Sequence, residues 1–185
     1  MSTAALEQAI ATTRGVLATV SSEQLDADTP CSSWKVRDVV NHLVGGQYFF
    51  AASVEGKPPA AATADFSTGD YVATFDEASA QCVAAFQGEG AMTKMLTLPF
   101  GQMPGSAFVG LAATDTFTHG WDLAKATGQS TDLDPALAAQ LLAGARQAIS
   151  PAFRGPEPKP FGPEQTAPAG ATNADQLAAF LGRTV

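Results

Sequence analysis

Asp115 and His119 stand one helical turn apart in a segment whose apolar residues follow a helical repeat. Residues four apart on a helix share a face, so the carboxylate and the imidazole can reach a common point. They fall on the stripe that would face a core, together with Phe108, Leu111, Ala112, Leu123 and Ala126. A buried carboxylate is costly unless a partner compensates, and a divalent cation is one such partner. A hydrogen-bonded Asp–His pair with a purely structural role is the alternative.

His42 is the second of the chain's two histidines. It lies in V-R-D-V-V-N-H-L-V-G-G, beside the apolar stripe of another predicted helix. If the two helices face each other, His42, Asp115 and His119 form a set of two histidines and one carboxylate. Three protein ligands leave a position open for water or substrate, which is typical of catalytic metal sites. A satisfied boundary histidine, or a buried polar network without an ion, remains the alternative.

Three charged residues near this set are candidates for supporting roles. Asp38 precedes His42 by one turn and could orient its imidazole, or it could be an exposed first-turn carboxylate favoured by the helix dipole. Asp122 follows His119 by three residues and could orient that ring in the same way, or face solvent. Arg37 is a candidate for binding an anionic substrate, with a solvated surface arginine as the alternative.

Other residues on these segments allow two interpretations. Gly45 and Gly46 interrupt a helix, either for close helix packing or to leave room for a ligand. Cys31, near a helix start, could have a lowered pKa and some reactivity, or be structural. Cys82 lies on an apolar stripe and is expected in the core, and Trp34 is expected to pack at a helix end.

Helices must position these side chains, and apolar residues follow a helical repeat in most of the chain. It predicts helices over about residues 3–20, 34–54, 69–88, 105–127 and 134–149, with a short C-terminal helix over 173–183. The stretch before residue 105 is rich in turn residues and predicts a short extended segment or hairpin. Residues 150–171 are rich in proline and glycine and are expected to wrap the surface. Few strand signals favour an all-α four-helix bundle forming a single domain over residues 1–185.

Composition excludes several classes of partner. The net charge is -8 and the basic residues are scattered, so nucleic acid is not expected. The chain has neither a run of about 18 apolar residues nor the start of a signal peptide, so we expect a cytoplasmic protein without membrane contact. A homodimer is compatible with these features.

The motifs around the histidines resemble a known family. They are T-P-C-S-S-W-K-V-R-D-V-V-N-H-L-V-G-G, D-T-F-T-H-G-W-D-L-A-K-A-T-G-Q and the closing F-G-P-E with D-Q-L-A-A-F-L-G-R. They are similar to the small single-domain, DinB-like metal-binding proteins of actinobacteria, close to the N-terminal domain of mycothiol-dependent maleylpyruvate isomerase. The resemblance implies a DinB-like bundle that holds one divalent metal through His42, Asp115 and His119. Zinc is the expected metal, with nickel, manganese or iron as alternatives. The isomerase has a glutamate where this chain has Asp115.

This resemblance implies a metal-dependent thiol transferase or isomerase. Mycothiol would be the co-substrate and a small electrophile the second substrate. One alternative is a metal- or small-molecule-binding module without turnover. Another is a metal-dependent hydrolase or iron(II) oxygenase, because the same ligand set supports both chemistries. The spacing of the residues names neither the thiol nor the electrophile.

Overall fold

The computed structural model describes residues 2–58, 64–155 and 161–185. It confirms a predominantly helical chain with one small antiparallel hairpin, as the sequence predicts. The helices are α1 (Ala4–Leu17), α2 (Val36–Glu55), α3 (Tyr71–Gln87), α4 (Gly105–Ala126), α5 (Pro135–Ala148) and α6 (Asn173–Phe180), with 3-10 turns at Ser22–Gln24 and Pro151–Phe153. The hairpin strands are β1 (Met95–Leu98) and β2 (Gly101–Pro104), in a register that pairs Met95 with Pro104.

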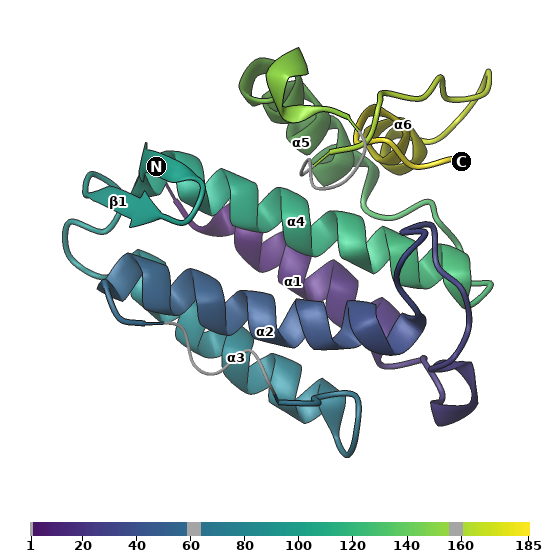
Figure 1. Cartoon of the computed structure of the whole chain (residues 1–185), viewed down its shortest axis with the longest axis horizontal. Helices are drawn as coiled ribbons and strands as arrows, with labels where there is room; N and C mark the ends of the chain where they lie inside the picture. Colours follow the sequence, from purple (N-terminus) through teal and green to yellow (C-terminus); the bar gives the residue numbers. More distant parts are fainter. Residues whose placement is uncertain (1, 59–63, 156–160) are drawn as a thin grey trace.

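Helices α1 to α4 form the bundle, and α5 and α6 pack together outside it on the side of α4 (Figure 1). Helix α2 packs against both α3 and α4, and α1 packs against α4 and α3. Large apolar side chains fill the interior, because each helix turns one apolar stripe inward. The largest fully buried ones include Phe75, Phe86, Phe108, Phe117 and Trp121.

The helix limits follow from capping residues. Asp70 accepts a hydrogen bond from the backbone N–H of Ala73 at the start of α3. Asp134 accepts one from the backbone N–H of Leu137 at the start of α5, where Pro135 is the first helical residue. Helix α2 ends at Gly56, whose φ of 72° is a left-handed conformation that glycine adopts without strain.

Helices α1 and α4 approach closely at Gly120. A Cβ atom at this position would lie 2.4 Å from the Oγ1 of Thr13. The Thr13 hydroxyl also donates a hydrogen bond of 2.9 Å to the backbone carbonyl of Thr116. This contact fixes α4 against α1 along the half of α4 that carries the candidate ligands.

The C-terminal part of the chain returns to the bundle. Helix α6 ends at Phe180, three residues before the predicted end, because Gly182 takes a φ of 97° and turns the chain. In its described part, the Pro/Gly-rich segment 150–171 contains one 3-10 turn and an isolated bridge between Arg154 and Phe161, with turns and coil elsewhere. Residues 156–160 lie outside the described residues. None of the described helices is long and apolar enough to cross a lipid bilayer.

Candidate metal centre

His42 and Asp115 meet between α2 and α4. The His42 Nε2 atom lies 3.1 Å from Oδ2 and 3.3 Å from Oδ1 of Asp115. Exposed fractions of 33% for the His42 side chain and 28% for that of Asp115 show that the pair is open to solvent on one side. A small molecule can therefore approach these two side chains.

His119 completes the set from the same helix as Asp115. Its Nε2 atom lies 3.6 Å from Asp115 Oδ1, and its side chain is only 10% exposed. The two imidazole rings meet edge to face, with 4.4 Å between their centroids. Each of the three residues offers a ligand atom, and these atoms all lie within 4.8 Å of one another.

The spacing of these atoms fits a divalent ion. Zinc binds imidazole nitrogen and carboxylate oxygen at about 2.0–2.2 Å in a tetrahedron, which places neighbouring ligand atoms about 3.3 Å apart. The separations between Asp115 and the two histidines run from 3.1 to 3.6 Å. The ligand atoms of the two histidines lie within 4.8 Å of each other, so a small rotation of the imidazoles would bring the three side chains around one ion.

The charges of Asp115 and His42 shift each other's pKa values in a direction that keeps Asp115 negatively charged. Burial would raise the pKa of Asp115, but the charge and hydrogen bond of His42 and the charge of His119 outweigh it and lower this pKa to about 2. Burial would likewise lower the pKa of His42, but the Asp115 carboxylate outweighs it and raises this pKa above 6.5. The carboxylate is thus ionised at neutral pH, and a metal would compete with a proton for His42.

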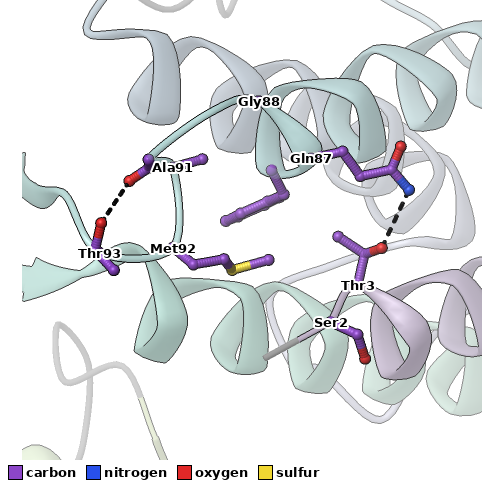
Figure 2. Close-up of a pocket in the computed structure, with 9 residues that line it drawn as sticks. Ser2, Thr3, Gln87, Gly88, Ala91, Met92 and Thr93 are labelled. Atoms are coloured by element: carbon purple, nitrogen blue, oxygen red, sulfur yellow. Dashed lines mark hydrogen bonds between the residues drawn. The ribbon is translucent and has the colours of Figure 1, made fainter.

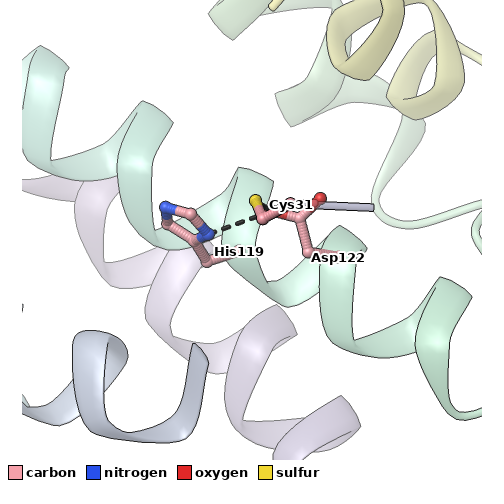
Figure 3. A group of neighbouring side chains, drawn as sticks. All are labelled: Cys31, His119 and Asp122. Carbon is pink, nitrogen blue, oxygen red and sulfur yellow. Dashed lines mark hydrogen bonds and ion pairs between the residues drawn. The ribbon is translucent and has the colours of Figure 1, made fainter. Parts of the chain in front are cut away.

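The other nitrogen of His119 faces Asp122. Figure 3 shows His119 and Asp122, both from α4, beside Cys31. His119 Nδ1 lies 2.9 Å from Asp122 Oδ2, an ion-pair distance without the alignment of a hydrogen bond. The Asp122 side chain is completely buried, and the Arg183 guanidinium contacts it at 2.9 Å. Burial would raise the pKa of Asp122, but Arg183 and His119 hold it far below its ordinary value.

Cys31 contacts the same oxygen of Asp122 that faces His119. Its thiol donates to Asp122 Oδ2 over 3.3 Å, and burial together with the Asp122 charge raises its pKa to about 12. The suggestion of a lowered Cys31 pKa is therefore wrong, because burial disfavours the thiolate and a carboxylate lies next to the sulfur. Cys82 is fully buried, as expected for a core residue.

Cys31, His119 and Asp122 form a second group with ligand-like spacing. Arg183 makes it a poor cation site, because its Nη2 lies 3.5 Å from the Cys31 sulfur and 2.9 Å from Asp122 Oδ2. The Cys31 thiol is also engaged already, as a hydrogen-bond donor to Asp122 Oδ2. The His42, Asp115 and His119 group is the better cation site of the two.

Trp34 forms an aromatic wall beside the imidazoles. Its ring centroid lies 4.9 Å from that of His42 and 5.3 Å from that of His119.

Gly46 lies near Asp115, and a Cβ atom at this position would lie 3.9 Å from Asp115 Oδ2, an ordinary contact distance. Close packing therefore does not require this glycine.

The remaining predicted site residues have partners of their own. Asp38 accepts a hydrogen bond of 2.8 Å from the backbone N–H of Lys35, at the start of α2. Arg37 pairs with Asp26 at 2.6 Å, and both side chains are exposed. Sequence reasoning gave Arg183 no role, although it is the last residue of the D-Q-L-A-A-F-L-G-R motif, because the spacing along the chain does not show that this tail meets Asp122.

A hollow lies at the other end of the bundle. It has a volume of about 410 Å³ and is bounded by the start of α1, the end of α3 and the turn before β1, including Thr3, Gln87 and Met92 (Figure 2). Met92 is hydrogen-bonded to Ser106 at the start of α4, whereas Asp115 and His119 lie 9 and 13 residues further along this helix. This hollow and the candidate metal centre are therefore separate features.

Comparison with known proteins places the chain in a family. Residues 6–124, which contain all three candidate ligands, match the family described as the mycothiol maleylpyruvate isomerase N-terminal domain. Two relatives, both described as uncharacterized proteins, come from Mycobacterium tuberculosis strains CDC 1551 / Oshkosh and ATCC 25618 / H37Rv. Each is 47% identical over 174 residues, covering 92% of this chain and 91% of the relative. No solved structure matches the chain significantly. The chain belongs to the mycothiol maleylpyruvate isomerase N-terminal domain family.

Proposed function

We propose that this chain binds one divalent metal through His42, Asp115 and His119 and uses it to activate a low-molecular-weight thiol. The observation that carries the proposal is the convergence of three ligand atoms from α2 and α4 within 4.8 Å. Zinc suits two imidazoles and one carboxylate with an open fourth position. Mycothiol is the thiol we propose, because the family description names it.

Each ligand residue contributes a separate property. Asp115 contacts both histidines and supplies the negative charge that balances a divalent ion. His119 is largely buried and forms the floor of the site, whereas the one-third exposure of His42 leaves its side open to a small thiol. A divalent ion bound here would lower the pKa of a coordinated thiol, so that it is deprotonated at neutral pH.

The proposed reaction is the transfer of the thiol to a small electrophile. The sulfur donates an electron pair to the electrophilic carbon, the bond to the leaving group breaks, and the thiol proton passes to solvent. Trp34 would give this side of the site an apolar wall that restricts water. An isomerase would instead add the sulfur to a carbon–carbon double bond without loss of a group, allow rotation about the resulting single bond, and expel the sulfur to restore the double bond.

Cobalt(II)-substituted protein offers a direct test. Mycothiol added to it is expected to produce an intense near-ultraviolet sulfur-to-cobalt absorption band, because cobalt reports thiolate ligands. Cys31→Ser is measured in parallel, since Cys31 is a sulfur near the site, and this variant should retain the band. His42→Ala should lose it. Protein that binds cobalt but gives no band with mycothiol would contradict thiol activation.

A further inference from the structure

Arg183 reaches the metal centre from the end of the chain. It lies beyond α6 and 61 residues from Asp122 in sequence, yet it makes two contacts with that carboxylate. Its Nη2 lies 2.9 Å from Oδ2 and its Nε 3.2 Å from Oδ1. A guanidinium that binds both oxygens of a carboxylate fixes the plane of that carboxylate.

Asp122 Oδ2 is the atom at which these contacts converge. It lies 2.9 Å from His119 Nδ1, 2.9 Å from Arg183 Nη2 and 3.3 Å from the Cys31 sulfur. The Asp122 side chain is completely buried and that of Arg183 is 14% exposed, so water competes little for these contacts. The direction of Oδ2 toward His119 therefore depends on Arg183.

This direction matters because the two nitrogens of an imidazole have different roles. A carboxylate beside Nδ1 keeps the proton on that nitrogen and leaves the lone pair of Nε2 free for a metal. The Nε2 atom of His119 faces Asp115, within the candidate ligand set. We propose that Arg183 is a positioning residue that holds Asp122 against His119 and so prepares Nε2 of His119 to bind the metal. This inference rests on the proposed metal site.

Arg183 also determines which of the two ligand-like groups can bind a cation. Its guanidinium stands beside both Cys31 and Asp122, so its positive charge repels an ion from the group that contains them. His119 belongs to both groups. Because Arg183 disfavours a cation in the group with Cys31 and Asp122, His119 remains available to bind a metal together with His42 and Asp115.

Zinc affinity of the untagged full-length chain, measured by competition with a chromophoric chelator, tests this inference. Arg183→Gln should weaken zinc binding by about 10- to 100-fold, the usual effect of losing a residue that orients a ligand. Arg183→Lys should recover part of the affinity, because it retains the charge. Asp122→Asn should weaken binding as well, and adding Arg183→Gln to it should have little further effect.

Arg154→Gln is the matched control for a tail that is merely loosened. Arg154 donates a hydrogen bond of 2.7 Å to the carbonyl of Phe180 and stacks on its ring, so it holds the same tail without touching Asp122. Wild-type zinc affinity in Arg183→Gln would overturn the inference, as would equal losses in Arg183→Gln and Arg154→Gln. If Arg183→Gln fails to fold, the double variant Arg183→Lys/Asp122→Asn is compared with Asp122→Asn alone. Equal zinc affinities support the inference, and a further large loss in the double variant overturns it. A wild-type chain that binds no zinc would instead refute the proposed function.

Discussion

The Nε2 atom of His42 lies 3.1 Å from Oδ2 of Asp115, although 73 residues separate them in sequence. This contact joins α2 to α4 on the side where both residues remain partly exposed. It brings the more exposed histidine to the carboxylate that also contacts His119. The two histidines of the chain therefore share one carboxylate.

The raised pKa of His42 predicts pH-dependent metal binding. His42 must lose its proton to bind a metal, and its pKa lies above 6.5 because of Asp115. Zinc affinity should therefore fall as the pH drops through this pKa, approaching about tenfold per pH unit below it. Chelator competition at a series of pH values measures the change. His42→Ala should bind zinc weakly and lose this pH dependence. A zinc affinity of the wild type that does not change with pH would contradict the assignment of His42 as a ligand.

The position of Trp34 predicts a fluorescence response to metal. Its ring lies beside both imidazoles, whereas Trp121 is buried and donates a hydrogen bond of 2.9 Å to Asp175. Titration with Co²⁺ or Ni²⁺ should quench the emission of the wild type and of Trp121→Phe. Trp34→Phe should lose most of the quenching. Equal quenching in both variants would show that the ion binds elsewhere.

The environment of Cys31 predicts a slowly reacting thiol. With a pKa of about 12, it should react with iodoacetamide at pH 8 roughly a thousandfold more slowly than an ordinary thiol, because the thiolate is the reactive form. Asp122→Asn removes a charge that raises this pKa and should accelerate the reaction. Peptide mass spectrometry measures the rate, with buried Cys82 as the internal control. Rapid alkylation of Cys31 in the folded wild type would contradict this description.

Two glycines predict opposite effects of alanine substitution. At Gly120 a Cβ atom would lie 2.4 Å from Thr13 Oγ1 and 3.2 Å from its Cα, so Gly120→Ala must push α1 and α4 apart. We expect it to destabilise the fold by about 1–3 kcal/mol. Gly46→Ala meets only ordinary contacts and should be neutral or stabilise by up to about 1 kcal/mol. Urea unfolding distinguishes them, and a larger loss in Gly46→Ala would contradict the packing described.

The sequence predicts local features of this protein better than distant ones. Apolar periodicity and capping residues place the helices to within a few residues, because both signals act over one or two turns. Asp115 and His119 are recognisable for the same reason, since they share a helical face. The end of α6 is less predictable, because it depends on the turn at Gly182.

The contacts of Arg183 and Cys31 are beyond such local reasoning. Both residues lie outside the ligand helices, and they meet Asp122 only because the loop before α2 and the C-terminal tail converge on α4. Nothing in the spacing of these residues encodes that convergence. The raised pKa of Cys31 follows from it and was consequently not predictable from the sequence.

Metal content of untagged protein tests the central claim most directly, because a histidine tag would add ligands of its own. Elemental mass spectrometry of the wild type should find close to one divalent ion per chain. His42→Ala and His119→Ala should each lose most of it while remaining folded by circular dichroism. Metal-free wild-type protein that also fails to take up added zinc, nickel, manganese or iron would contradict the account. The His42, Asp115 and His119 cluster would then be a hydrogen-bonded structural group.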